Sequence, residues 1–209
     1  MKTILCYGDS NTWGNVPRSD ARYPKSVRWP GALQELLGEG YEVISEGLCG
    51  RTFVALDPKR PHRTGITHLR ALLESAAPLD LVIVMLGTND VKSTYSLSSE
   101  DIASHLEETI GLIQSDELDM EETPKILVIC PPSVITPSDG KIDPRMERAS
   151  EKFESLPGLF KRVAEKMGCE FLNAGDHISS SAIDGYHLDE AAHLALAKAV
   201  RNRIANLSI

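Results

Sequence analysis

Short runs of apolar, often β-branched residues alternate along this chain with longer segments in which apolar residues recur every three or four positions. The short runs predict strands, and the longer segments predict amphipathic helices. Residues 81–86 are apolar at every position, which is typical of a central strand covered on both faces. The predicted strands are residues 3–7, 42–45, 81–86, 126–130 and 170–172.

Five segments have helical spacing. Pro30 fits the first turn of a helix that begins at Trp29, and Ser98 with Asp101 resembles a capping box at the start of another. A longer helix is predicted from Met146 to Met167, interrupted near Pro157-Gly158. The other two helices are marked by Leu69, Leu72 and Leu73 before Pro78, and by Leu196, Val200, Ile204 and Leu207 after a start near Asp189.

Strands that alternate with helices predict an α/β fold with one parallel sheet. We therefore expect a three-layer α/β/α sandwich, in which a five-stranded parallel sheet lies between two layers of helices. No repeat, low-complexity stretch or linker divides the chain, so residues 1–209 are expected to form a single domain. Ligands of open parallel sheets bind beyond the carboxyl ends of the strands, so the chemistry is expected in the segments that follow the strands.

The charge of the chain disfavours nucleic acid as a partner. The formal net charge is −8 at pH 7, and the basic residues are scattered. The densest basic group, Lys59, Arg60 and Arg63, includes no aromatic residue that would stack on a base. Nucleic-acid affinity depends on Lys and Arg side chains that neutralise phosphates, so we expect no nucleic-acid partner.

The apolar runs and the cysteines predict a cytoplasmic protein. No run approaches the roughly 18 to 20 residues of a membrane span, and residues 3–7 are too short for the core of a signal peptide. The four cysteines are far apart and form no C-x-x-C pair, so they indicate neither a zinc site nor a redox pair. We expect reduced thiols, no membrane association, and no metal or other cofactor.

Gly8, Asp9 and Ser10 follow the first predicted strand, where the chain must turn sharply. A serine at this point has its hydroxyl exposed above the sheet, in a position to act as a nucleophile. The same residues also fit a turn in which Ser10 caps a helix or binds a phosphate at the helix N-terminus. Taken alone, Ser10 leaves both catalysis and anion binding open.

A serine hydroxyl becomes nucleophilic when a base removes its proton, and a carboxylate commonly orients that base. Asp184 and His187 supply both groups within four residues, on a loop just ahead of the last predicted helix. An ordinary turn before a helix would also explain this pair. Asp176 and His177 are the nearest alternative, and the sequence alone does not exclude them.

Acyl transfer also needs hydrogen-bond donors for the tetrahedral oxyanion. Asn89 follows the most buried predicted strand and offers a side-chain amide, while Gly50 follows the second strand and can bring its N–H close to a substrate. Trp13, three residues after Ser10, is a candidate for substrate binding, with packing beneath the first loop as the alternative. Asp9 is a second candidate, although anchoring the turn suits it better.

Four segments, in order, resemble the four conserved blocks of the SGNH (GDSL) hydrolase superfamily. They are Gly8-Asp9-Ser10, Gly47-x-x-Gly50, Gly87-x-Asn89-Asp90 and Asp184-x-x-His187. The resemblance implies a flavodoxin-like fold, with Ser10 as nucleophile, His187 as base and Asp184 as orienting acid. It also implies an oxyanion hole made by the N–H groups of Ser10 and Gly50 and the side chain of Asn89.

Within this superfamily the chain is most similar to bacterial arylesterases that also act as acyltransferases and perhydrolases. Residues 4–14, 27–29, 46–48, 51–52 and 85–90 carry the likeness. It implies hydrolysis of a small-molecule ester with a short acyl chain, an acyltransferase side activity and a homo-oligomer. Asn15 stands where those relatives carry a bulky aromatic residue, and Gly50 replaces a small residue with a Cβ, so hydrolysis is favoured over acyl transfer.

Two alternatives stay open, and the second of them is not an enzyme. Another specificity within the superfamily would make the chain a carbohydrate acetylesterase, a lysophospholipase or a thioesterase. A non-enzymatic, flavodoxin-like anion-binding domain would explain the fold and the first turn but leave Asp184, His187 and Asn89 without a task. A metal-dependent hydrolase lacks support, because the chain has no H-x-H or H-E-x-x-H motif.

Overall fold

The computed structural model describes residues 1–207 and contains a five-stranded parallel sheet with the order β2-β1-β3-β4-β5. This is the flavodoxin-like strand order, and it confirms the predicted fold class. All five predicted strands are present, each shifted by at most two residues at either end. Their bounds are Lys2–Gly8 (β1), Tyr41–Gly47 (β2), Leu81–Met85 (β3), Lys125–Cys130 (β4) and Glu170–Asn173 (β5).

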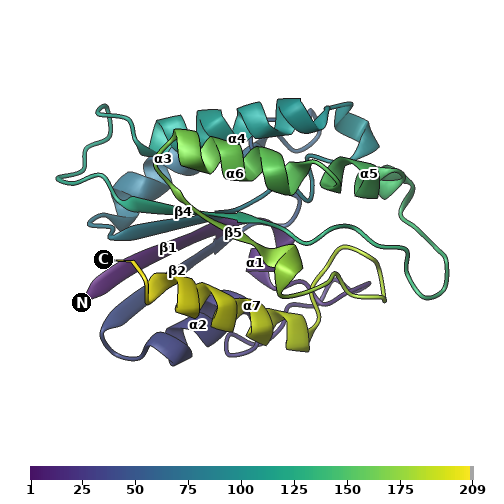
Figure 1. The fold of residues 1–209 in the computed structure, drawn as a ribbon, viewed down its shortest axis with the longest axis horizontal. Helices are drawn as coiled ribbons and strands as arrows, with labels where there is room; N and C mark the ends of the chain where they lie inside the picture. The colour runs from purple at the N-terminus through teal and green to yellow at the C-terminus, as the bar shows by residue number, and fades with distance from the viewer. Residues whose placement is uncertain (208–209) are drawn as a thin grey trace.

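Helices cover both faces of the sheet, as Figure 1 shows. On one face lie α3 (Gly65–Ala76), α4 (Ser99–Ile113) and α6 (Leu156–Lys166); on the other lie α2 (Trp29–Leu37) and α7 (Glu190–Ile204). The N-terminus lies at the end of the sheet away from α1 (Ser10–Trp13), the short helix that follows β1. The predicted three-layer sandwich is therefore confirmed.

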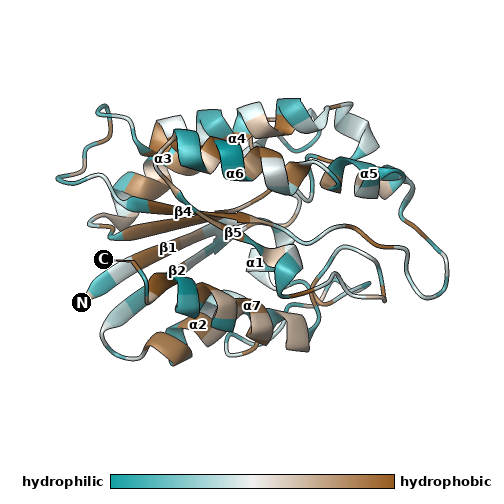
Figure 2. Cartoon of the chain, in the orientation of Figure 1, coloured by the Kyte–Doolittle hydropathy of each residue, from teal (hydrophilic) through white to brown (hydrophobic). Residues whose placement is uncertain are grey.

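The alternation of side chains along each strand creates two hydrophobic cores, one on each face of the sheet. Val82 and Val84 of β3 join the core beneath α3, α4 and α6, whereas Leu81, Ile83 and Met85 join the core beneath α2 and α7. All five side chains are buried, as expected for a central strand. Figure 2 shows the corresponding hydrophobic strands between helices whose outer faces are more polar.

The helix predicted from Met146 to Met167, with an interruption near Pro157-Gly158, is interrupted in the structure, although slightly earlier than predicted and with a later start. The segment consists of the 3-10 turn Pro144–Met146, the short helix α5 (Ala149–Phe153) and α6. The break falls at residues 154–155, just before Pro157 rather than at it. Pro157 occupies the first turn of α6, where its missing N–H has no partner to lose.

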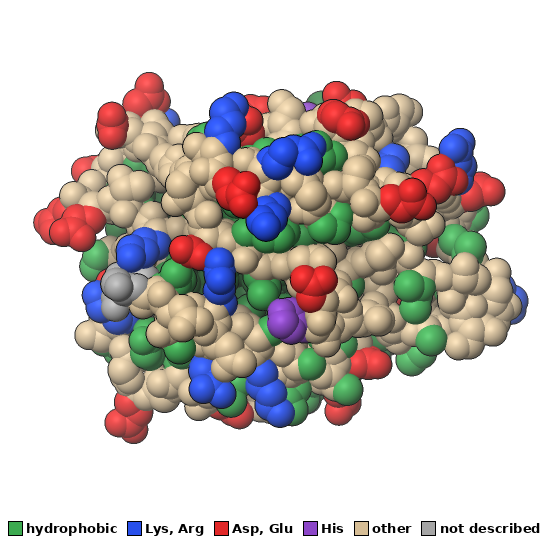
Figure 3. All heavy atoms as spheres, in the orientation of Figure 1, with side chains coloured by type: hydrophobic (Ala, Val, Ile, Leu, Met, Phe, Trp, Pro, Cys, Tyr) green, Lys and Arg blue, Asp and Glu red, His purple; other side chains and the backbone are tan. Residues whose placement is uncertain are grey.

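The last helix begins as predicted, because Asp189 caps its N-terminus by accepting from the Ala192 N–H at 2.8 Å. It ends at Ile204, so Leu207 lies beyond the helix and packs against the second core from there. No helix within residues 1–207 is both long and apolar enough to span a membrane. Figure 3 shows one face of the molecule, over which acidic and basic side chains are interspersed.

Candidate active site

Ser10 is the first residue of α1, directly beyond the carboxyl end of β1. The Asp9 carboxylate caps this helix by accepting from the Asn11 N–H at 2.9 Å. A Cβ on Gly8 would lie 2.0 Å from the Thr12 hydroxyl, so only glycine lets the helix fold back against the end of β1. The tight turn leaves the Ser10 hydroxyl at the sheet edge, with the residue 7% exposed.

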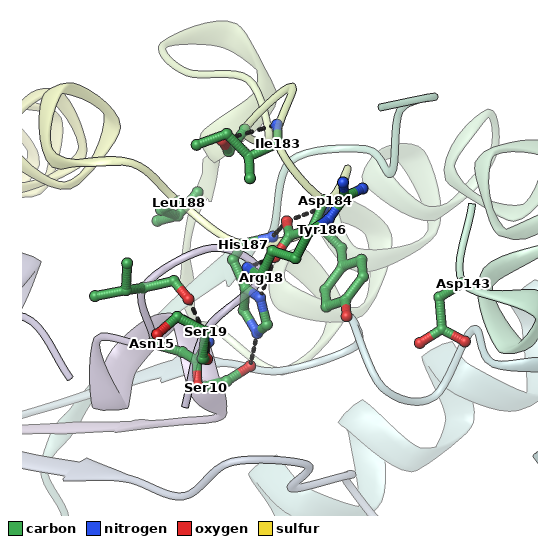
Figure 4. Close-up of polar contacts among 12 residues, drawn as sticks. Ser10, Asn15, Arg18, Ser19, Asp143, Ile183, Asp184, Tyr186, His187 and Leu188 are labelled. Atoms are coloured by element: carbon green, nitrogen blue, oxygen red, sulfur yellow. Dashed lines mark hydrogen bonds and ion pairs between the residues drawn. The ribbon is translucent and has the colours of Figure 1, made fainter. Parts of the chain in front are cut away.

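Ser10, His187 and Asp184 form a continuous hydrogen-bonded line, as Figure 4 shows. His187 Nε2 lies 3.0 Å from Ser10 Oγ, and His187 Nδ1 lies 2.7 Å from Asp184 Oδ2. Ser10 comes from the start of the chain, whereas the other two residues lie on the loop before α7. The structure thus brings together the nucleophile, base and orienting acid that the sequence predicted.

The surroundings of Asp184 keep its carboxylate charged. Burial opposes ionisation, but the hydrogen bond and charge of His187 outweigh it, and the pKa of Asp184 falls to about 2. Backbone N–H groups of Arg18 and His187 also donate to this carboxylate, at 2.8 and 3.0 Å. A charged Asp184 favours the His187 tautomer with its proton on Nδ1, which leaves Nε2 free to accept the Ser10 proton.

Asn11 joins the nucleophile helix to the loop that carries the base, a link that the sequence did not predict. Its side chain donates to the Tyr186 carbonyl and accepts from the Leu188 N–H, each at 3.1 Å. These bonds flank His187 on both sides in the chain. The only sequence signal for this role is the position of Asn11 next to Ser10, since its partners lie some 175 residues away.

We expect Asn11→Ala to lower kcat for a short aryl ester by about tenfold, because a shift of the His187 loop misaligns base and nucleophile. KM should change less, since Asn11 does not line the pocket. Steady-state kinetics of the purified variant test this, with Asn206→Ala, which removes an exposed amide at the end of the chain, as control. Equal kcat values for the two variants would contradict the positioning role.

Gly50 and Asn89 lie with Ser10 and His187 in the lining of one pocket of about 510 Å³. Gly50 has a φ of +81°, and a Cβ at this position would lie 2.6 Å from Arg63 Nη1. Within residues 1–207, neither the Ser10 N–H nor the Gly50 N–H donates a hydrogen bond to another protein group. Both donors are therefore available to a ligand beside the Ser10 hydroxyl.

The amide of Asn89 is fixed in orientation. Its Nδ2 donates to the Arg51 carbonyl at 3.0 Å, and its Oδ1 accepts from Lys92 Nζ at 2.5 Å. A second, long contact of 3.4 Å joins Nδ2 to the Asp9 carboxylate. Because the contact to Asp9 is long, the N–H that makes it is the one that remains available to a substrate oxygen.

Arg51 binds the carboxyl ends of β1 and β2 next to the site through hydrogen bonds, a role that the sequence did not predict. Its guanidinium donates to the carbonyl of Gly8 at 2.9 Å and to the carbonyl of Glu46, and its Cζ lies 4.2 Å from the centre of the Tyr7 ring. The side chain therefore ties the carboxyl ends of β1 and β2 together, while its own carbonyl holds Asn89. Burial lowers the pKa of Arg51.

The two predicted substrate-binding residues lie outside the pocket lining. Asp9 is buried, where it caps α1 and faces Asn89, and burial raises its pKa. The Trp13 ring packs against Arg22, whose guanidinium carbon lies 4.8 Å from the ring centre. Trp13 therefore packs as in the alternative given for it and lies outside this lining, and Asp9 anchors the turn that holds Ser10; a substrate-binding role for either residue stays a prediction.

The alternative pair, Asp176 and His177, makes no hydrogen bond with Ser10. Asp176 accepts from the Asn173 side chain at 2.8 Å, and His177 is exposed after β5. Within residues 1–207, no three His, Cys, Asp or Glu side chains gather in a way that could hold a metal ion. The Ser10 hydroxyl instead faces His187.

Comparison with known proteins identifies the type of site. The model of the GDSL-like lipase/acylhydrolase family matches residues 6–195. Est24, a carbohydrate acetylesterase from Sinorhizobium meliloti, is 38% identical, with a TM-score of 0.93 over 98% of this chain and 99% of its own. No curated protein matches the sequence significantly.

Two arylesterase structures are similar to the same extent. The native aryl esterase of M. smegmatis is 35% identical, with a TM-score of 0.93 over 99% of this chain and 100% of its own. A putative arylesterase from Agrobacterium tumefaciens is also 35% identical, with a TM-score of 0.92 over 99% of each chain. The likeness therefore extends over the whole fold and over every segment that builds the site.

Proposed function

Because this chain belongs to the GDSL-like lipase/acylhydrolase family and is a carboxylic ester hydrolase, we propose that it cleaves small esters with short acyl chains through an acyl-enzyme on Ser10. The observation that carries this proposal is the hydrogen-bonded line from Ser10 through His187 to Asp184. The open end of that line lies in a pocket that also presents Gly50 and Asn89. An anion-binding domain would have no use for this arrangement.

The proposed reaction begins when His187 Nε2 takes the Ser10 proton as Oγ bonds to the ester carbonyl carbon. The carbonyl π electrons move to oxygen, and the N–H groups of Ser10 and Gly50 and the amide of Asn89 stabilise that oxyanion. The intermediate then re-forms the carbonyl and breaks the bond to the alcohol, which takes the proton from His187. Water, deprotonated by the same nitrogen, attacks the acyl-enzyme carbonyl. The second intermediate then breaks its bond to Ser10 Oγ, which takes the proton back from His187 as the acid leaves.

Asn89→Ala is expected to lower kcat by roughly 10²- to 10³-fold, the usual effect of losing one oxyanion donor. KM should change little, because the hydrogen bond from the Asn89 amide strengthens only as negative charge develops on the substrate carbonyl oxygen. Kinetics with p-nitrophenyl acetate, together with the melting temperature of the variant, test this. A well-folded variant with wild-type kcat would remove Asn89 from the oxyanion hole.

The pocket lining supports a short acyl chain and a polar substrate. It contains several charged side chains and few apolar ones, whereas a lysophospholipid or a long-chain thioester needs an extended apolar surface. A carbohydrate acetylesterase activity is the second candidate, favoured by this polarity and by the likeness to Est24. Acyl transfer to an alcohol is a side activity in this proposal.

Turnover of a substrate panel tests the proposal. We expect hydrolysis of p-nitrophenyl acetate and phenyl acetate, a steep fall as the acyl chain lengthens, and little activity on lysophospholipids. Comparable rates on acetylated sugars would establish the second candidate, and ester product formed in added alcohol would establish acyl transfer. A preference for long acyl chains would overturn the proposal.

The remaining expectations stay predictions. The four cysteines are free thiols, which supports a location in the cytoplasm. The small-molecule ester as partner, the exclusion of nucleic acids and membranes, and the homo-oligomer rest on the sequence. Sedimentation analysis of the purified protein tests the oligomeric state.

A further inference from the structure

Basic side chains are concentrated in the lining of the active-site pocket. Lys59, Arg60 and Arg63, the densest basic group in the sequence, all line it, and Lys92 and Arg145 join them from later parts of the chain. Among the described residues, 1–207, Asp57 is the one carboxylate in the same lining. This concentration contrasts with the net charge of −8 and with the interspersed charges on the face in Figure 3.

Acidic neighbours neutralise only part of this charge. Arg60 pairs with Asp57 at 2.7 Å, and Arg145 pairs with Asp143 at 2.6 Å. The other three basic side chains form no ion pair with a carboxylate of the described chain, residues 1–207; they are Lys59, Arg63 and Lys92. We call these three cations uncompensated, because no carboxylate of residues 1–207 lies within ion-pair distance of them.

Two of the three uncompensated groups are partly buried beside the oxyanion donors. The Arg63 guanidinium approaches Gly50, and its Nε is buried without a hydrogen-bond partner in the described chain. Lys92 Nζ donates to the Asn89 side chain on the other side. Burial lowers the pKa of Lys92 to about 8, so this ammonium group is mostly charged at neutral pH despite its poor solvation.

A cation withdrawn from water without a counter-ion is unfavourable, and an anionic ligand removes that cost by a charge-assisted hydrogen bond. Catalysis of a neutral ester requires one transient negative charge, at the oxyanion, whereas the pocket offers three uncompensated cations. We propose that the preferred ester carries a permanent anionic group, a carboxylate or a phosphate, that binds to Arg63, Lys92 and Lys59. This inference rests on the proposed esterase function and defines its substrate class.

Matched pairs of esters test the inference at low ionic strength. With the charge on the alcohol side, 4-acetoxybenzoate and 4-acetoxyphenyl phosphate are compared with methyl 4-acetoxybenzoate. With the charge on the acyl side, p-nitrophenyl hydrogen glutarate is compared with p-nitrophenyl valerate. In the alcohol-side series, each kcat/KM is divided by the uncatalysed hydrolysis rate of the same ester, so that differences in the leaving group cancel. The two acyl-side esters share one leaving group and are compared directly by kcat/KM, because the glutarate carboxylate attacks its own ester in water.

In at least one series, we expect the anionic ester to exceed its neutral partner by about tenfold, and the advantage to shrink in high salt, because mobile ions screen the attraction. The series in which the anionic ester is preferred identifies the side of the ester that carries the charge. Comparison of 4-acetoxybenzoate with 4-acetoxyphenyl phosphate shows whether the site prefers a carboxylate or a phosphate. Neutral esters that match or exceed their anionic partners in every series would overturn the inference.

Variants connect the preference to Arg63. Arg63→Gln should lower the ratio of anionic to neutral kcat/KM by about tenfold, and Arg63→Lys should restore most of it. Arg201→Gln removes the same charge from the exposed surface of α7 and should leave the ratio unchanged. Should Arg63→Gln fail to fold, Lys59→Gln on the exposed rim gives the same comparison. A ratio that falls equally in Arg201→Gln would contradict a local anion site.

Binding without turnover separates this inference from the proposed function. In Ser10→Ala, titration calorimetry should detect benzoate binding that is tighter than benzamide binding and weakened by Arg63→Gln. Equal affinity for the two probes overturns the anion site, whether or not esters are hydrolysed. If the enzyme hydrolyses neutral esters and shows no preference for anionic ones, only this inference is contradicted. If it hydrolyses no ester, the proposed function itself is contradicted.

Discussion

Ser10→Ala is expected to lower kcat for p-nitrophenyl acetate by roughly 10⁴- to 10⁶-fold, the range found when a triad nucleophile is removed. The alanine leaves no oxygen to form the acyl-enzyme, while Gly50 and Asn89 remain in place to bind the carbonyl. A small residual rate above that of water should therefore persist, and KM should change far less than kcat. Stopped-flow and steady-state kinetics of the purified variant measure both.

The matched control for this experiment is Ser155→Ala. Ser155 is exposed before α6, and the one hydrogen bond that its hydroxyl makes within residues 1–207 is a long one, 3.3 Å to the Lys152 carbonyl. Its replacement should leave kcat unchanged. A Ser10→Ala enzyme with more than a few per cent of wild-type turnover would show that the reaction does not proceed through this hydroxyl.

His187→Ala is the second large effect, with an expected loss of roughly 10⁴- to 10⁶-fold in kcat. Without the imidazole, no other side chain of residues 1–207 lies within hydrogen-bond distance of Ser10 Oγ to accept its proton, and Asp184 loses the partner that it orients. The pH dependence of the residual rate should change in form, because proton transfer then passes directly to water. Measurement of kcat/KM across the pH range tests both expectations.

His177→Ala is the informative control, because Asp176 and His177 were the alternative pair in the sequence. His177 is exposed and has no contact with Ser10, so this variant should keep its activity. The opposite pattern, an active His187→Ala enzyme and an inactive His177→Ala enzyme, would reassign the base.

The hydrophobic pattern was sufficient for the architecture because each strand alternates between two cores and each helix has one apolar face. The pattern predicted helix boundaries less well, because tertiary contacts as well as the local spacing of apolar residues decide where a helix ends. The break before α6 falls at residues 154–155, slightly ahead of the interruption predicted at Pro157-Gly158, and α1 is only four residues long, too short for a periodic signal. Leu207 keeps the apolar period although the helix has already ended.

The triad was predictable because its chemistry restricts which residue types can act together, and Asp184 and His187 are close in the sequence. The supporting residues were not, because their partners are distant in the chain. Asn11 acts on a loop some 175 residues later, and Arg51 holds the end of the first strand. The basic pocket was hidden for a related reason: the net charge averages over a surface on which Arg63 and Lys92 gather only after folding.

The most direct test of the esterase account is reaction with a serine-directed phosphonate, followed by mass spectrometry of the intact protein and of its peptides. The account predicts one adduct per chain on Ser10, loss of ester hydrolysis in proportion to labelling, and no adduct in Ser10→Ala. An adduct on another residue, or hydrolysis that persists in fully labelled enzyme, would contradict it.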